Sequence, residues 1–217
     1  MDLFTAMRQR QSARAFLDRP VARCDIEEIF ECAGLAPSAI NLQPWEFVIT
    51  YGEEKDRLVR RLKKARNERQ VACGPGTAEP LPEKFVDRSR RAAQLMKPAV
   101  DKLGVDFNRF VEEGSCGFYG APVAIIVTLD RRFPQLRYLD VGLSVAFLLL
   151  AAQAKELATC PIGLITAYGN EIADVLSIPE NKEIVLGIAL GYAEEKAPLN
   201  QFKTDRAEQR EILHWYE

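Results

Sequence analysis

The sequence predicts an α+β fold, or mixed α/β layer fold, built as a single domain. Three observations lead to this prediction. Apolar runs typical of strands are separated by segments with helical periodicity. One helix-rich stretch interrupts that alternation, and 47% of the 217 residues are hydrophobic, which is enough for a packed core.

The first quarter of the chain predicts two helices, a strand and a further helix. We expect a short helix at Asp2–Arg10 and a second at Ile26–Leu35, with Asp25 as its N-cap. Trp45–Tyr51 is rich in aromatic and β-branched residues and therefore predicts a strand. Glu53–Ala65 has the pattern of a charged amphipathic helix.

Residues 66–118 break the alternation and predict a helical insertion within the domain. Gly74-Pro75-Gly76 indicates irregular chain, and Pro82–Val111 contains two helical patterns that we expect to part near Lys97-Pro98. Four aromatic residues in this stretch or directly after it either pack in the core, which we favour, or form a lid over a site: Phe107, Phe110, Phe118 and Tyr119.

The second half contains the clearest buried segments. Ala121–Leu129 and Glu183–Tyr192 are apolar and β-branched, and both predict buried strands. Arg137–Ala158 predicts a long helix that is apolar nearly all round, which places it in a core or across a large interface. Asn170–Leu176 predicts a short capped helix, and the polar tail 193–217 is too long to be a simple finish to a monomer.

Composition excludes several classes of function. The 29 Lys and Arg residues against 31 Asp and Glu give a net charge of −2, which argues against a nucleic-acid-binding surface. The single histidine, His214, disfavours Ser-His-Asp and Cys-His catalysis, so we expect any enzymatic chemistry to belong to a cofactor. We expect a cytoplasmic protein that lacks a membrane span, because the most apolar stretch, Val141–Ala152, is short.

The cysteines predict neither a metal site nor a disulfide framework. They are odd in number and scattered, without a CxxC pair, which is typical of a reducing compartment. We interpret all of them as packed thiols: Cys24, Cys32, Cys73, Cys116 and Cys160.

Four segments carry the residues best suited to bind a ligand. Arg10-Gln11-Ser12-Ala13-Arg14 offers two guanidiniums, which suit phosphate oxygens, although a solvated arginine-rich turn has the same spacing. The loop 36–45 places Ser38, Asn41 and Gln43 between two prolines, as either a heterocycle-binding loop or an ordinary capped loop. The third segment is Cys160-Pro161-Ile162-Gly163, where glycine allows close approach of a ring. The fourth is the tail, with the cations Lys203 and Arg206.

Taken in this order, the segments resemble the nitroreductase family of FMN-dependent oxidoreductases. The resemblance rests on Arg10-x-Ser12-x-Arg14 and on the loop that reads APSAINLQPW from Ala36 to Trp45. It also rests on the strand led by Gly120-Ala121-Pro122, on the helix that begins at Asp140, and on the late strand that ends in Leu190-Gly191-Tyr192. It covers about residues 1–51 and 119–217, and the insertion matches nothing that we can place.

The resemblance implies a fold, an assembly and a site. It implies a central, mostly antiparallel sheet flanked by helices, in a homodimer that exchanges C-terminal tails and binds FMN at the interface. Arg10, Gln11, Ser12 and Arg14 would then hold the phosphate, ribityl chain and pyrimidine edge, with Lys203 and Arg206 completing the phosphate site. The loop residues Pro37, Ser38 and Ala39 would come from the other subunit, with Asn41 beside the ring system. Pro161, Ile162 and Gly163 would lie along the ring, with backbone N–H groups near its N5 atom.

The function that the resemblance implies is a ping-pong oxidoreductase. NADH or NADPH would supply hydride, and a nitro-aromatic, quinone or similar small molecule would accept it. Two features differ from some members: Ile162 stands where they have an acidic residue, and only Asn67 and Arg69 could match their Asn and Lys after the first strand. Alternatives are other FMN chemistry on the same scaffold (reductive dehalogenation, ene reduction, flavin fragmentation), a non-catalytic FMN-binding dimer, and an RNA-binding module that uses the arginines between Arg8 and Arg23.

Overall fold

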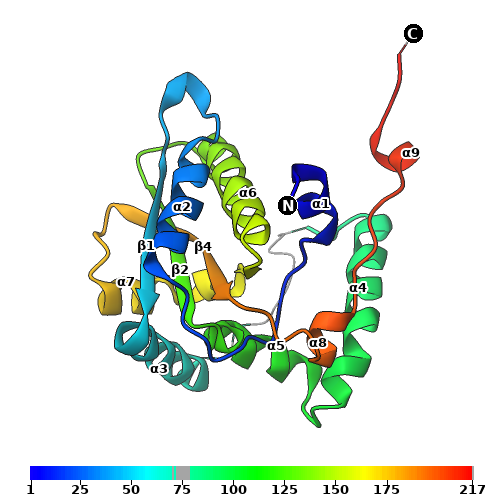
Figure 1. Cartoon of the computed structure of the whole chain (residues 1–217), viewed down its shortest axis with the longest axis horizontal. Helices are drawn as coiled ribbons and strands as arrows, with labels where there is room; N and C mark the ends of the chain where they lie inside the picture. Colours follow the sequence, from blue (N-terminus) through cyan, green and yellow to red (C-terminus); the bar gives the residue numbers. More distant parts are fainter. Residues whose placement is uncertain (70, 72–78, 217) are drawn as a thin grey trace.

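The structure is a computed structural model that describes residues 1–69, 71 and 79–216. A four-stranded antiparallel sheet in the order β1-β2-β4-β3 lies at its centre, with β1 at Trp45–Tyr51, β2 at Val123–Asp130, β3 at Ala158–Ile162 and β4 at Lys182–Gly191 (Figure 1). The helices are α1 (Leu3–Gln9), α2 (Arg23–Gly34), α3 (Gly52–Glu68), α4 (Glu83–Asp101), α5 (Phe107–Cys116), α6 (Tyr138–Ala154), α7 (Gly169–Leu176), α8 (Pro198–Gln201) and α9 (Gln209–Ile212). The α+β prediction and the mostly antiparallel sheet are confirmed.

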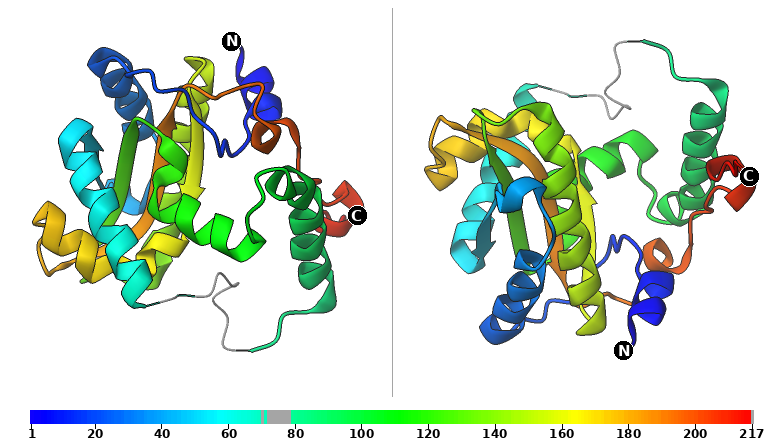
Figure 2. Two further views of the ribbon diagram at one scale, coloured as in Figure 1. Left: turned by 90° about the horizontal axis from the view of Figure 1, so that it is seen from below. Right: turned by 90° about the horizontal axis from the view of Figure 1, so that it is seen from above.

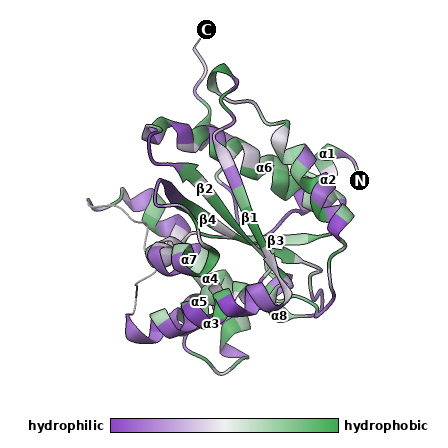
Figure 3. Ribbon diagram, turned by 90° about the vertical axis from the view of Figure 1, so that its left-hand side faces the viewer, coloured by the Kyte–Doolittle hydropathy of each residue, from purple (hydrophilic) through white to green (hydrophobic). Residues whose placement is uncertain are grey.

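Strand β2 shows why helices cover both faces of the sheet. All eight of its residues are buried, and side chains along a strand alternate between faces. Ile125 and Val127 therefore join a core with α2 and α6, while Ala124 and Ile126 join a second core with α3 and α7. Figure 3 shows the sheet between these helix pairs, and the two cores fix β2 at the centre of the molecule.

Helix α6 connects one core to an uncovered apolar surface. Ser144 donates a hydrogen bond of 2.9 Å to the Ala33 carbonyl of α2, and Leu148 is fully buried between the helix and the sheet. Leu139 is 64% exposed, and Phe147 is 40% exposed. The segment Gln135–Ala154 is long and apolar enough to cross a membrane by length and composition alone, a test that core helices of soluble proteins also pass.

The insertion and the tail lie together, beside the sheet rather than on it. Helix α4 stands apart from the strands in both views of Figure 2, and α8 lies near its base in Figure 1. Met96 and Val100 of α4 pack with Leu199 of α8 in a third, smaller core. An ion pair of 2.7 Å between Arg88 and Glu211 links α4 to α9.

Several sequence-based boundaries are wrong. Helix α2 begins at Arg23, so Asp25 lies in its first turn and pairs with Lys155, the residue that follows α6, rather than capping the helix. Pro98 lies inside α4, which ends three residues later, and the two insertion helices part at residues 102–106. Helix α6 ends at Ala154, and after a turn the chain forms β3 from Ala158, a strand that sequence analysis missed.

The aromatic residues of the insertion and the cysteines divide between buried and accessible positions. Phe118 is fully buried, and Phe107 and Phe110 pack against the third core, as the favoured interpretation predicted. Cys116 and Cys160 are buried thiols, whereas Cys24 and Cys32 are exposed, so their interpretation as packed thiols is wrong. Cys73 and Gly74-Pro75-Gly76 lie outside the described residues.

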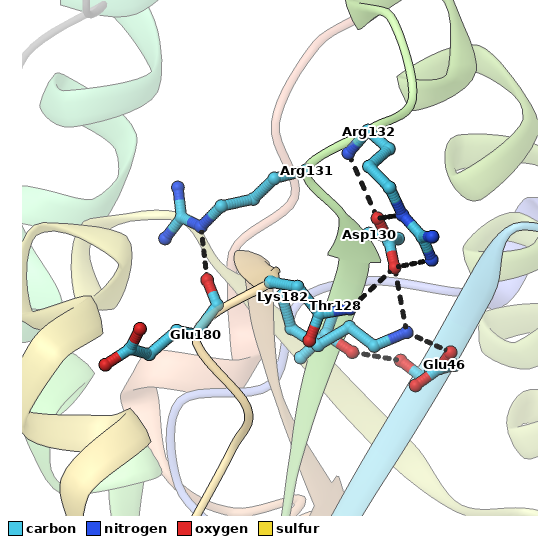
Figure 4. A network of polar contacts seen from close by, with 8 residues as sticks. Glu46, Thr128, Asp130, Arg131, Arg132, Glu180 and Lys182 are labelled. Atoms are coloured by element: carbon cyan, nitrogen blue, oxygen red, sulfur yellow. Dashed lines mark hydrogen bonds and ion pairs between the residues drawn. The ribbon is translucent and has the colours of Figure 1, made fainter.

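A polar network at the end of β2 holds the ends of neighbouring strands together (Figure 4). The buried Asp130 carboxylate accepts two hydrogen bonds of 2.8 Å from the Arg132 guanidinium and one of 2.8 Å from the Asn181 amide. Lys182 of β4 pairs with Asp130 and with Glu46 of β1, which joins three strands. These bonds, above all those from Arg132, hold the pKa of Asp130 well below its ordinary value.

We expect the Asp130 network to make stability depend on acid pH. The folded-state pKa lies below the unfolded value near 4, so the contribution is present at neutral pH and is lost as the pH falls below about 4. The urea midpoint of the wild-type protein should therefore fall more between pH 7 and pH 3 than that of Asp130→Asn. An equal fall in the two proteins would contradict this role for the carboxylate.

Candidate functional site

A pocket of about 290 Å³ lies between the segment after α1 and the tail after α8. The first segment runs from Arg10 to Arg14, and an isolated bridge from Ser12 to Thr159 fastens it beside β3. The pocket is lined by Met7, Arg8, Arg10, Gln11, Ser12, Arg14, Phe202, Lys203, Thr204 and Arg206. Two candidate segments that stand at opposite ends of the sequence therefore meet at one site.

The pocket gathers positive charge. Five of its lining side chains are cations: Arg8, Arg10, Arg14, Lys203 and Arg206. None of the salt bridges among the described residues includes any of these five side chains. Burial, and then the nearby charge of Arg206, hold the pKa of Arg10 below its ordinary value. An anion bound here would relieve that repulsion.

Asn200 holds the two segments together. Its side-chain oxygen accepts a hydrogen bond of 2.8 Å from the backbone N–H of Arg14, and its side-chain nitrogen donates to the carbonyls of Ala15 and Glu194 at 2.7 and 2.9 Å. Its own carbonyl accepts a bond of 2.6 Å from the Gln11 side chain. Asn200 is buried, so these bonds form out of water and fix the backbone that carries the cations.

Gln11 presents an acceptor that lacks a partner. Its nitrogen is engaged with Asn200, but its buried side-chain oxygen Oε1 has no hydrogen-bond partner within the described residues. Buried polar atoms normally have partners, so this oxygen suits a ligand that offers a hydroxyl or N–H donor. A second, open cavity of about 750 Å³ lies on the other side of the segment and is also lined by Gln11 and Asn200.

The third predicted segment lies at the end of β3, next to Ser12. Cys160 and Ile162 are buried in the core of the sheet, and Gly163 is exposed. Burial raises the pKa of the Cys160 thiol, against the opposing charges of Arg14 and Arg10, which confirms Cys160 as a packed thiol. Because the Ile162 side chain is buried, only its backbone is available to a ligand beside Pro161 and Gly163.

The second predicted segment, the loop 36–45, does not line the pocket. Pro37, Ala39 and Asn41 are exposed in the loop between α2 and β1, and Ser38 accepts a hydrogen bond of 2.9 Å from the Gln43 N–H. Ile40 and Asn41 have φ values of 44° and 57°, in the left-handed region, and Ile40 is 90% exposed. A β-branched residue held in that conformation at the surface is strained, which is common where a loop serves a site rather than the core.

Sequence reasoning missed several residues of the site. Met7, Arg8, Phe202 and Thr204 line the pocket, and Asn200 fixes its walls. Arg8 stands in the N-terminal run of arginines and could have been included on charge alone. No local pattern predicts a role for Asn200 or Phe202, because the residues that they contact in the N-terminal segment lie some 190 residues away along the chain.

Comparison with known proteins assigns the fold and the pocket to one family. A model of the Nitroreductase family matches residues 7–192, and the chain belongs to this family. The match includes the N-terminal arginines, the loop 36–45 and all four strands.

Individual relatives are similar over the full length of the chain. A 4-nitrobenzoate reductase of Pseudomonas putida is 32% identical over 99% of this chain and 95% of its own length. The solved structure of the FMN-dependent nitroreductase NfnB from Mycobacterium smegmatis in complex with NADPH is 28% identical, with a TM-score of 0.89 and full coverage of both chains. The FMN and NADPH-dependent NfnB from Sphigopyxis sp. strain HMH is 26% identical, with a TM-score of 0.90 and the same coverage.

We expect Asn200→Ala to destabilise the fold by about 2–4 kcal/mol, because it leaves the buried Arg14 N–H without its acceptor and removes two further bonds. Urea unfolding measures the change. Gln201→Ala is the matched control, since Gln201 is the exposed neighbour and its loss should cost less than about 0.5 kcal/mol. Equal effects of the two substitutions would contradict the role of Asn200.

Proposed function

We propose that this protein is an FMN-dependent NAD(P)H oxidoreductase that reduces a nitro-aromatic, quinone or similar small acceptor in a ping-pong order. The observation that carries the proposal is the pocket whose five cations have no carboxylate partner among the described residues. A phosphate group is the anion that arginine forks and a lysine together suit best. The names of the relatives support FMN as the molecule that carries it.

The residues present fit FMN. Arg10, Ser12, Lys203 and Arg206 would hold the phosphate, and the open Gln11 oxygen would accept a hydrogen bond from a ribityl hydroxyl. Arg14 would stabilise negative charge at the pyrimidine edge of the ring. When bound, FMN supplies the chemistry, which is to accept hydride from the nicotinamide and deliver it to the acceptor.

The remaining roles of the chain are to position the ring and to limit access to it. The backbone of Pro161, Ile162 and Gly163 would line one face of the ring, with Ile162 kept in place by the core. The chain needs no side-chain acid or base, because water can supply the protons. The only histidine stands in the exposed tail, which agrees with chemistry carried by a cofactor.

We also propose that the site is completed by a second copy of the chain. The exposed apolar side of α6, with Leu139, Leu143 and Phe147, and Leu136 just before the helix offer a surface for dimerisation. The strained loop with Pro37, Ser38, Ala39 and Asn41 would then reach the partner's FMN. The tail leaves the body beyond α9 with Trp215 81% exposed, which supports an exchange of tails between subunits (Figure 1). In this proposal residues 1–217 form one FMN-binding domain, with 66–118 as a helical insertion, in the cytoplasm.

An anaerobic absorbance spectrum tests the proposed function. We expect a yellow protein whose flavin band bleaches on addition of NADPH, the nucleotide named for two of the solved relatives, or of NADH. A yellow protein that stays oxidised with both nucleotides would favour a regulatory or specialised role. A colourless protein that cannot be loaded with FMN would contradict the proposal.

We expect Arg206→Ala to weaken FMN binding by about 10- to 100-fold, because it removes a charged donor to the phosphate. Fluorescence titration of the apoprotein measures the dissociation constant. Arg210→Ala is the matched control, since Arg210 is an exposed tail arginine already paired with Glu208, and its loss should leave binding unchanged. If Arg206→Ala binds FMN as tightly as the control does, Arg206 does not hold the phosphate.

A further inference from the structure

Arg14 differs from the other cations of the pocket because it lies against two aromatic rings. Its guanidinium carbon is 6.0 Å from the centre of the Tyr119 ring and 5.8 Å from that of Phe202. Both distances lie within the range in which a cation is attracted to a ring face. Tyr119 follows the insertion and Phe202 belongs to the tail, so two remote segments contact one cation.

Tyr119 is itself held firmly. Its φ of 51° lies in the left-handed region, which a bulky residue adopts only when its surroundings enforce it. Its hydroxyl lies 3.5 Å from that of Ser115, and its ring centre lies 5.9 Å from that of Phe110. Both neighbours belong to α5 of the insertion.

Gly114 of α5 provides the space that the Tyr119 ring occupies. A Cβ atom at Gly114 would lie 2.3 Å from Cε1 and 2.6 Å from Cδ1 of that ring, closer than any real contact. Glycine inside a helix is unfavourable, so its presence at this point has a reason in packing. The Tyr119 ring packs against α5 only because Gly114 has no side chain.

We propose that Tyr119 is a positioning residue that holds Arg14 in the anion pocket, and that α5 thereby sets the affinity of the site for FMN. Arginine has many rotamers, and fixing it before binding removes an entropic cost that the ligand would otherwise bear. The tyrosine contributes no charge, so it acts through Arg14. This inference rests on the proposed function.

A double-mutant cycle on FMN binding tests the inference. Dissociation constants are measured by fluorescence titration for Tyr119→Leu and Tyr119→Phe, each with Arg14 and with Arg14→Met. We expect Tyr119→Leu to weaken binding about tenfold when Arg14 is present, and less than about twofold when it is replaced. Tyr119→Phe keeps the ring and should stay within about threefold of the wild type.

Gly114→Ala tests the same inference from outside the pocket. Alanine strengthens the helix, so any loss of FMN affinity arises from displacement of the ring. We expect a loss similar to that of Tyr119→Leu, and no further loss when the two substitutions are combined. Gly169→Ala, where the new methyl group would meet only Ile184 at 3.9 Å, should leave affinity unchanged.

Three results would overturn the inference. If Tyr119→Leu weakens FMN binding equally with and without Arg14, Tyr119 has a general structural role. If Tyr119→Leu or Gly114→Ala binds FMN with wild-type affinity, Tyr119 does not position Arg14. A wild-type chain that fails to bind FMN would contradict the proposed function as well, whereas normal wild-type binding with an unaffected Tyr119→Leu variant would contradict only this inference.

Discussion

The arrangement of the two ends of this chain depends on neutral contacts that overcome the repulsion between like charges around one small pocket. Burial, and then the nearby charge of Arg206, hold the pKa of Arg10 below its ordinary value, yet the fold keeps these two cations in one pocket. What holds them is uncharged: the amide of Asn200, the bridge from Ser12 to Thr159, and the small core of α4 and α8. Because these contacts are neutral and largely buried, they attach the N-terminal segment to the tail without giving the cations a carboxylate partner among the described residues.

The sheet and its main helices follow from patterns that the sequence carries locally. Strands β1, β2 and β4 are long runs of β-branched and aromatic residues, and their burial needs no knowledge of the partner strand. Strand β3 has only five residues, contains Pro161, and begins only four residues after α6 ends, so the predicted helix was extended to its first residue and the strand itself was not recognised. The misplaced boundary at Pro98 has a similar cause, since a proline near the end of a helix removes only one late hydrogen bond.

The site was predictable only as far as its residues stand close together in sequence. Arg10, Ser12 and Arg14 form a compact motif, and the tail cations were found because the resemblance included them. Asn200 acts through contacts with a segment far along the chain, and nothing in its neighbours marks it. Tyr119 was considered only as an aromatic residue of the core or of a lid, because its contact with Arg14 depends on a segment far along the chain. The exposure of Cys24 and Cys32 depends on which side of α2 faces the sheet, which composition does not reveal.

The placement of the pocket at both ends of the sequence has a consequence for how the protein is made. Arg14 leaves the ribosome early, but Lys203 and Arg206 follow nearly 200 residues later. At about 5–20 residues per second, the interval is on the order of 10–40 s. During that time the sheet and its helices can fold around an N-terminal segment that still lacks Asn200. The cation pocket is therefore completed only after all four strands of the sheet have been synthesised.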